Sequence, residues 1–220
     1  MDIPRSYIAF FDLDRTIIKL NSGSLLIRKA YKSGFMSTGY LLNAILQGYL
    51  YKFNLRDTKM IISRMGMWLK GLHHEMIDEL SQEVVNIYLI NSIRPEIIKE
   101  ITFHKEQNGI IVMLSSGISS ICEPIGRHLA FDDIICTTME TINGILTGAP
   151  VGNFCFGDEK RKRLEEYCKL RNYKPGDAFY YADSISDLPA LEIVGHPVCI
   201  TPDKKLRKTA NEKGWKIHNW

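Results

Sequence analysis

The amino-acid sequence predicts an α/β fold in which a parallel sheet carries helices on both faces. Four short apolar runs that end in small or acidic residues are typical of buried parallel strands. They cover residues 7–13, 110–114, 178–182 and 197–200. Stretches with helical periodicity at 118–129, 159–171 and 187–194 alternate with the last three runs. This alternation favours a parallel sheet covered on both sides by helices.

The interval from residue 22 to residue 92 breaks the alternation, because it has no convincing strand and much helical periodicity. Its first helix is indicated by apolar residues at three- and four-residue steps: Leu42, Ile45, Leu46, Tyr49, Leu50 and Phe53. Two more helices are expected over 57–69 and 74–88. The sequence therefore predicts a helical insertion after the first strand. Later in the chain, Gly144 and Gly148 indicate a hairpin or a loop excursion.

The first helix of the insertion lies in a stretch without charges that runs from Ser33 to Tyr51, with Lys32 and Lys52 just outside it. Its serine, threonine, asparagine, glutamine and glycine residues make it too polar for a stable membrane span. Two interpretations stay open. The apolar stripe packs inside the insertion, or part of it lies open to an apolar leaving group or to an anionic bilayer.

Composition sets limits on the class of protein. The chain has 220 residues, of which 45% are hydrophobic, and a formal net charge of +3, so overall charge does not predict nucleic-acid binding. The five cysteines are widely spaced and include no CxxC pair, which is typical of reduced thiols in a cytoplasmic protein. The first apolar run is too short for a signal peptide. A cytoplasmic location is therefore expected.

Polar residues follow the predicted strands at the edge where a parallel sheet binds ligands. Asp12 and Asp14 follow the first run, Ser115 the second, and Asp183 and Asp187 the third. Carboxylates brought together at one edge repel one another unless a cation lies among them, and oxygen ligands suit Mg²⁺. A phosphate brought to this cation needs further positive charge and N–H donors. Lys160 and the turn at Ser115 can supply them.

These residues resemble the motifs of the haloacid dehalogenase superfamily, in the subgroup related to phosphoserine phosphatase. The first motif, two aspartates separated by one residue and followed by a threonine, is Asp12, Asp14 and Thr16. The second is a serine, Ser115, and the third is the lysine of the sequence Gly-Asp-Glu-Lys, Lys160. The acidic pair Asp183 and Asp187 completes the set. Four motifs in the family's order make a specific combination.

The resemblance implies a three-layer Rossmann-like core, formed by residues 1–21 and 93–220, with a helical cap at 22–92 inserted after the first strand. It implies a Mg²⁺-dependent phosphomonoester hydrolase that forms an aspartyl-phosphate on Asp12, with Asp14 as acid and base. Asp12, the main-chain carbonyl of Asp14 and Asp183 would hold the metal, and Asp187 would orient Lys160 or a metal-bound water. The other site residues expected from it are Ser115, Ser116, Gly117, Thr16 and Lys160 around the phosphate, and Arg56 and Arg64 in the cap.

Structural explanations for single residues remain possible at this point. Ser115 is also typical of a helix N-cap, Asp187 of an acid in a first helical turn, and Lys160 of a solvated basic run. A catalytically silent scaffold that binds a membrane surface or nucleic acid through the basic insertion is the alternative to an enzyme. The clustered carboxylates favour the enzyme, and no nucleic-acid partner is expected.

The substrate class follows less directly. Phosphoserine phosphatases carry an acidic residue shortly after the first motif, but this chain has neither Asp nor Glu between Asp14 and Asp57. Seven cations occupy that interval instead: Arg15, Lys19, Arg28, Lys29, Lys32, Lys52 and Arg56. The substrate is therefore expected to be a small-molecule or lipid phosphate other than phosphoserine, with weak contact to an anionic membrane surface as a further possibility.

Overall fold

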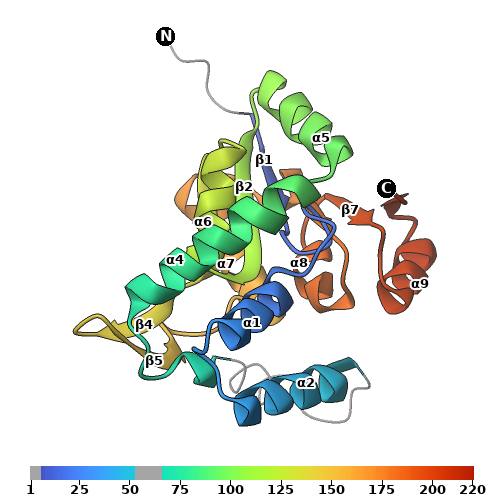
Figure 1. The fold of residues 1–220 in the computed structure, drawn as a ribbon. Helices are drawn as coiled ribbons and strands as arrows, with labels where there is room; N and C mark the ends of the chain where they lie inside the picture. Colours follow the sequence, from blue (N-terminus) through green and yellow to red (C-terminus); the bar gives the residue numbers. More distant parts are fainter. Residues whose placement is uncertain (1–5, 53–65) are drawn as a thin grey trace.

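The computed structural model describes residues 6–52 and 66–220 (Figure 1). Within them, a six-stranded sheet has the order β3-β2-β1-β6-β7-β8, and all neighbouring strands are parallel. The strands are β1 (Ile8–Phe11), β2 (Ile110–Ile118), β3 (Asp133–Thr137), β6 (Phe179–Ala182), β7 (His196–Ile200) and β8 (Lys216–His218). The predicted α/β fold class is confirmed.

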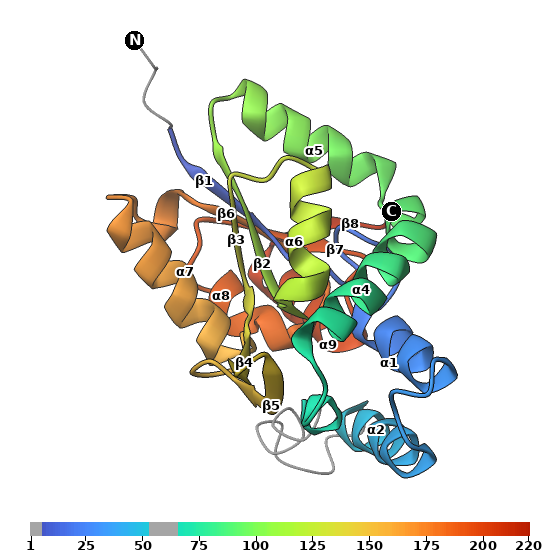
Figure 2. The same cartoon turned by 60° about the vertical axis from the view of Figure 1, so that its left-hand side comes forward.

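Helices cover both faces of this sheet, so β1 is buried on both sides. On one face lie α4 (His74–Val84), α5 (Pro95–Glu106) and α6 (Ser119–His128), which pack with Ala9 and Phe11. On the other lie α7 (Asp158–Leu170), α8 (Leu188–Leu191) and α9 (Lys204–Lys213), which pack with Ile8 and Phe10 (Figure 2). All four β1 side chains are buried, as expected for a central parallel strand.

Strands β3 and β8 and helix α5 are among the elements that the sequence analysis did not predict. Strands β3 and β8 have five and three residues, and both are only partly buried, so neither has the long apolar run of a central strand. Helix α5 begins at Pro95, which suits a first helical position, and it buries Ile97 and Ile101. The five cysteines are buried free thiols.

The segment after β1 is helical, as predicted. It contains α1 (Ser22–Lys32), α2 (Thr38–Lys52), a 3₁₀ turn at Met67–Leu69 and α4, which continues into a π-helical turn at Val85–Leu89 and a 3₁₀ turn at Ile90–Ser92. Most of the helix predicted over 57–69 lies outside the described residues. Within the described part of the chain, no helix is both long and apolar enough to cross a membrane.

The apolar stripe of α2 does not pack inside the insertion where the structure describes its side chains. Leu42, Ile45 and Leu46 are all exposed, with 61%, 60% and 52% of their surface accessible. The packed interpretation is therefore wrong for these three residues.

The predicted hairpin is present as β4 (Met139–Ile142) and β5 (Ile145–Pro150). Both turn residues, Asn143 and Gly144, have positive φ, which the tight turn between right-twisted strands requires. The hairpin then bonds to the segment before α4, since Leu146 donates to the Leu72 carbonyl and His74 donates to the Gly144 carbonyl. It therefore joins the core to the inserted segment.

A buried polar chain crosses the sheet face under α5. The Tyr181 hydroxyl donates to Glu100 at 2.7 Å, so it accepts from His104 Nε2 at 2.8 Å. His104 Nδ1 then accepts from the Tyr7 hydroxyl at 2.8 Å. Both imidazole nitrogens are thus used by a neutral ring, and burial lowers the pKa of His104 to about 4 from 6.5.

His104 should make the chain less stable in acid. The folded state resists protonation of this ring, so its contribution is complete above pH 6.5 and is lost as the pH falls towards 4. The free energy of unfolding should drop by about 3 kcal/mol from this group over that window. Urea unfolding at several pH values gives the slope of the unfolding free energy against pH for the parent chain and for His104→Gln, and the parent slope should be the steeper one. Equal slopes would contradict the assignment.

Candidate active site

Three buried carboxylates meet at the carboxyl edge of the central strands. Asp12 follows β1, Asp183 follows β6, and Asp187 ends the 3₁₀ turn Ile185–Asp187. Because β1 and β6 are neighbours in the sheet, their ends bring Asp12 and Asp183 together. One oxygen of each carboxylate lies within 4.8 Å of the others, and the residues are 5%, 7% and 2% exposed. This carboxylate cluster is the centre of the candidate site.

Lys160 places its ammonium inside the carboxylate cluster. Its Nζ lies 2.7 Å from Asp12 Oδ1 and 2.6 Å from Asp187 Oδ1, and the residue is 1% exposed. It sits in the first turn of α7, whose N-cap Gly157 has a positive φ that favours glycine. The interpretation of Lys160 as part of a solvated run is wrong, because Lys160 is buried at the sheet edge, whereas Lys162 of the same run is exposed.

Tyr180 is a site residue that sequence analysis missed. Its hydroxyl donates to Asp187 Oδ1 at 2.9 Å and accepts from Lys160 Nζ at 3.1 Å. A tyrosine in a buried strand is most often a core residue, so the sequence carries no signal for this role. Here it supports both the lysine and the acid that flanks it.

Burial and mutual repulsion dominate the electrostatics of the cluster. Loss of solvation raises the pKa of Asp12 to about 7, Lys160 lowers it, and Asp187 raises it. Loss of solvation, together with Asp12 and Asp187, raises the pKa of Asp183 to about 8. Although burial opposes its charge, Asp12 and Asp187 raise the pKa of Lys160. One ammonium thus faces three carboxylates, which leaves an excess of negative potential.

Asp14 is held apart from the carboxylate cluster. Its Oδ1 accepts from the Ser22 backbone N–H at 2.7 Å, and its Oδ2 accepts from Asn21 Nδ2 at 3.5 Å. Asn21 also caps α1 by accepting from the Ser24 backbone N–H at 2.9 Å. Burial raises the pKa of Asp14, while the hydrogen bonds from Ser22 lower it. The carboxyl group of Asp14 is therefore tied to the start of the insertion.

The last residues of β2 form a second part of the candidate site. Ser115 is buried, and its hydroxyl accepts from the Gly117 backbone N–H at 3.1 Å. A Cβ at Gly117 would lie 2.9 Å from the Cys122 sulfur, so this close approach requires glycine. Helix α6 starts at Ser119 with Ile118 as its N-cap, so the N-cap interpretation of Ser115 is wrong. Ser116 is exposed, and its carbonyl accepts from Thr137 Oγ1 at 3.0 Å.

The loop of the first motif is bent and braced. Arg15 has a φ of 59°, and its carbonyl accepts from the Arg94 guanidinium at 3.1 Å. Arg94 also donates to the Trp220 carbonyl at 2.6 Å. Thr16 is fully buried, and its hydroxyl has no hydrogen-bond partner among the described residues. An unpartnered buried hydroxyl beside Asp12 is free to donate to a bound anion.

Asp203, the N-cap of α9, supports the cluster, and sequence analysis did not single it out. Its Oδ2 accepts from the Ile185 backbone N–H at 2.8 Å, and its own N–H donates to the Asp183 carbonyl at 2.8 Å. Its Oδ1 caps α9. Asp203 therefore fixes the loop that carries Asp183 and Asp187. Arg56 and Arg64, expected in the cap, lie outside the described residues.

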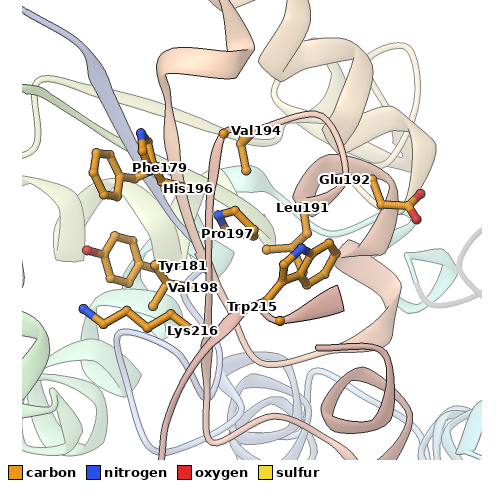
Figure 3. A pocket seen from close by; sticks show the side chains of 12 residues that line it. Phe179, Tyr181, Leu191, Glu192, Val194, His196, Pro197, Val198, Trp215 and Lys216 are labelled. Carbon is orange, nitrogen blue, oxygen red and sulfur yellow. The ribbon is translucent and has the colours of Figure 1, made fainter. Parts of the chain in front are cut away.

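A separate pocket of about 370 Å³ lies at the opposite edge of the sheet (Figure 3). Phe179 and His196, the first residues of β6 and β7, line it together with Trp215 and Lys216. The carboxylate cluster follows the other ends of these strands, so the pocket is not part of the candidate active site.

The family of haloacid dehalogenase-like hydrolases matches residues 9–192, a range that holds all four motifs. The chain belongs to this family. A probable phosphatase of Mycobacterium tuberculosis is 29% identical over 213 residues, which cover 95% of this chain and 74% of the relative. A histidinol-phosphatase of Neisseria meningitidis is 28% identical over 220 residues, covering 97% of this chain and 98% of the relative.

Structural similarity agrees with the family match. A solved phosphoserine phosphatase complex with bound substrate has a TM-score of 0.75 at 15% identity, and the match covers 99% of this chain and 95% of that one. The family and its phosphoserine-phosphatase-like subgroup, inferred from the sequence motifs, are confirmed, as is the enzyme class of a phosphatase in this family.

Removal of the buried ammonium should destabilise the fold. Lys160→Met leaves Asp12 and Asp187 without their cation, and breaking a buried ion pair in this way costs about 3–5 kcal/mol. Lys162→Met, two residues away and exposed, is the matched control and should change stability by less than about 0.5 kcal/mol. Urea unfolding in a chelator measures both variants. Similar losses of unfolding free energy in the two variants would show that Lys160 does not stabilise the cluster.

Proposed function

We propose that the chain is a Mg²⁺-dependent phosphomonoester hydrolase that acts through an aspartyl-phosphate on Asp12. The observation that carries this proposal is the buried cluster of Asp12, Asp183 and Asp187 around the Lys160 ammonium. Such a cluster pairs a nucleophilic carboxylate with positive charge for a phosphoryl group.

The residues at this edge fit a divalent cation. Three carboxylates face one ammonium, so an ion of charge +2 would balance the cluster, and the donors nearby are hard oxygen atoms that suit Mg²⁺. We assign Asp12, Asp183 and the main-chain carbonyl of Asp14 as its ligands. Asp187, bonded to Lys160 and Tyr180, orients the lysine. When bound, Mg²⁺ would offset negative charge on the substrate phosphate.

Asp12 and Asp14 have different roles in the proposed reaction, Asp12 as the nucleophile and Asp14 as the acid and base. An Asp12 oxygen attacks the phosphorus while the ester bond to the leaving oxygen breaks, and Asp14 gives its proton to that oxygen. Water then attacks the aspartyl-phosphate and passes a proton back to Asp14, which releases phosphate and restores Asp12. The raised pKa of Asp14 supports its role as the acid, because it favours the protonated form.

The surrounding donors would hold the phosphate. Ser115 and the backbone at Ser116 and Gly117 belong to the end of β2, the neighbour of β1, and are proposed as donors, and the unpartnered hydroxyl of Thr16 offers a further donor. Lys160 would neutralise charge on Asp12 and on the phosphoryl group.

Residues 22–92 are proposed as a cap over a core of residues 1–21 and 93–220. The link between Asp14 and Ser22 supports this division, because it joins the catalytic loop to the first inserted helix. The salt bridge from Lys29 of α1 to Glu83 of α4 joins helices within the proposed cap. In the cap, Arg56 and Arg64 remain candidates for substrate contact.

The substrate is proposed to be a small-molecule or lipid phosphate monoester. The histidinol-phosphatase relative matches nearly its whole length, which makes an amino-alcohol phosphate one class to test. The lack of Asp and Glu between Asp14 and Asp57 argues against phosphoserine. A turnover panel that contains histidinol phosphate, phosphoserine and a lysophosphatidic acid, with and without Mg²⁺, compares these classes directly.

Asp12→Asn should abolish turnover while leaving the fold intact. The amide keeps the shape but lacks the attacking charge, so kcat for a generic aryl phosphate should fall by at least about 10³-fold. Asp177→Asn, at an exposed position in the 3₁₀ turn Pro175–Asp177, is the control and should keep parental kcat. Beryllofluoride should label the parent chain and not the Asp12 variant. Near-normal turnover of Asp12→Asn would refute the proposed nucleophile.

Asp183→Asn should separate stability from metal binding. Without metal, the variant should unfold at a Tm higher by about 2–4 °C, because it removes a carboxylate whose ionisation its neighbours oppose. Added Mg²⁺ should raise the Tm of the parent chain and of Asp177→Asn, but not that of Asp183→Asn. Thermal unfolding with and without Mg²⁺ measures this. A full Mg²⁺ shift in Asp183→Asn would exclude Asp183 as a ligand.

A further inference from the structure

The exposed face of α2 has an unusual composition for a helix in contact with water. Leu42, Ile45 and Leu46 are exposed large apolar residues on one side of this helix, and we call them the α2 apolar face. The helix holds one charged residue, Lys52, at its last position. A helix that is apolar on most sides is normally buried in a core or in lipid. The α2 apolar face therefore needs an apolar environment on its outer side.

In the described stretch from Arg15 to Lys52, which includes α1 and α2, every charged residue is a cation. Arg28 and Lys32 of α1 are exposed, and Lys32 is the last residue before the loop that leads to α2. Lys29 is instead paired with Glu83 of α4. No Asp or Glu occurs anywhere from Arg15 to Arg56. Arg28 and Lys32 have no ion pair among the described residues. An apolar helix face that follows a helix with such cations matches a bilayer with anionic headgroups, where apolar side chains enter the acyl boundary and cations meet lipid phosphates.

The α2 apolar face lies on the catalytic side of the molecule. Helix α1 starts at Ser22, whose N–H bonds to Asp14 at the carboxyl edge of the sheet. In both Figure 1 and Figure 2, α1 lies between this edge and α2. A surface that met α2 would therefore lie near the entrance to the candidate active site.

We propose that the α2 apolar face, with Arg28 and Lys32, docks on an anionic lipid bilayer. A second copy of the chain is the weaker occupant, because two such faces would bring like charges together without any acidic residue to pair them. We expect α2 to lie in the surface of the bilayer, since the helix is too short and too polar to span a membrane. That lipid phosphates are then presented to Asp12 rests on the proposed function, but the docking itself does not.

Vesicle flotation tests the docking without using activity. The full chain should bind phosphatidylcholine vesicles that contain phosphatidylglycerol, should bind pure phosphatidylcholine much more weakly, and should be released at high salt. Arg28→Gln with Lys32→Gln should weaken the partition by about 30-fold, from about fivefold for each cation. Leu42→Gln with Ile45→Gln should weaken it by at least about tenfold, and because both residues are exposed the fold should be retained.

Two control variants match these changes elsewhere on the surface. Lys204→Gln with Lys205→Gln removes two exposed cations from α9, and Leu170→Gln changes a residue of α7 that is 82% exposed. Both should bind like the parent chain. We call Lys204→Gln with Lys205→Gln the α9 variant and Leu42→Gln with Ile45→Gln the α2 variant. Loss of vesicle binding in the α9 variant, or parental vesicle binding in the α2 variant, would overturn the proposal.

The same preparations distinguish lipid from a second copy. Sedimentation should show the same oligomeric state for the parent chain and for Leu42→Gln with Ile45→Gln. A parent dimer that the α2 variant dissociates would show that a second copy covers the face, and would overturn the bilayer proposal. Parental turnover of a soluble aryl phosphate by the α2 variant would show that lost docking is separate from the chemistry.

Discussion

The arrangement of this protein depends on one electrostatic constraint, the confinement of three carboxylates with a single ammonium at the edge of a sheet. Asp12 and Asp183 reach this edge only because β1 and β6 are adjacent, and Lys160 reaches it only because α7 starts beneath it. Tyr180 hydrogen-bonds to Asp187 and Lys160 in this region, and Asp203 bonds to the loop that carries Asp183 and Asp187 while it also caps α9. The cluster is costly when isolated, and a bound cation would offset that cost.

Sequence patterns revealed the central part of the fold and the charged members of the site, for physical reasons. The strands β1, β2 and β6, at whose ends Asp12, Ser115 and Asp183 lie, are central and mostly buried, so their apolar runs are clear in the sequence. Strands β3 and β8 lie at the edges, where partial burial leaves little pattern. Charges at the ends of buried strands are conspicuous, whereas the Tyr180 hydroxyl is hidden in a residue that also packs well in cores. Asp203 looks like a simple helix cap, which it also is.

The inserted segment shows the limit of periodicity. The steps between Leu42, Ile45 and Leu46 correctly indicated a helix, but they did not indicate what the helix packs against. Periodicity records which side chains share a face, and a core, a membrane and another chain all select the same pattern. In contrast, α4 buries Ile77 and Leu80 in the main core, although it belongs to the same segment. Only the three-dimensional arrangement separates the two helices.

The central place of β1 has a consequence for synthesis on the ribosome. Its partner β6 is made roughly 170 residues after β1, and Lys160 is 148 residues away from Asp12. At about 5–20 residues per second, β1 waits on the order of ten seconds or more before its second edge is covered. An apolar strand with an open edge invites pairing with other chains. Nascent chains of this protein should therefore depend on chaperones, and the carboxylate cluster is among the last features to assemble.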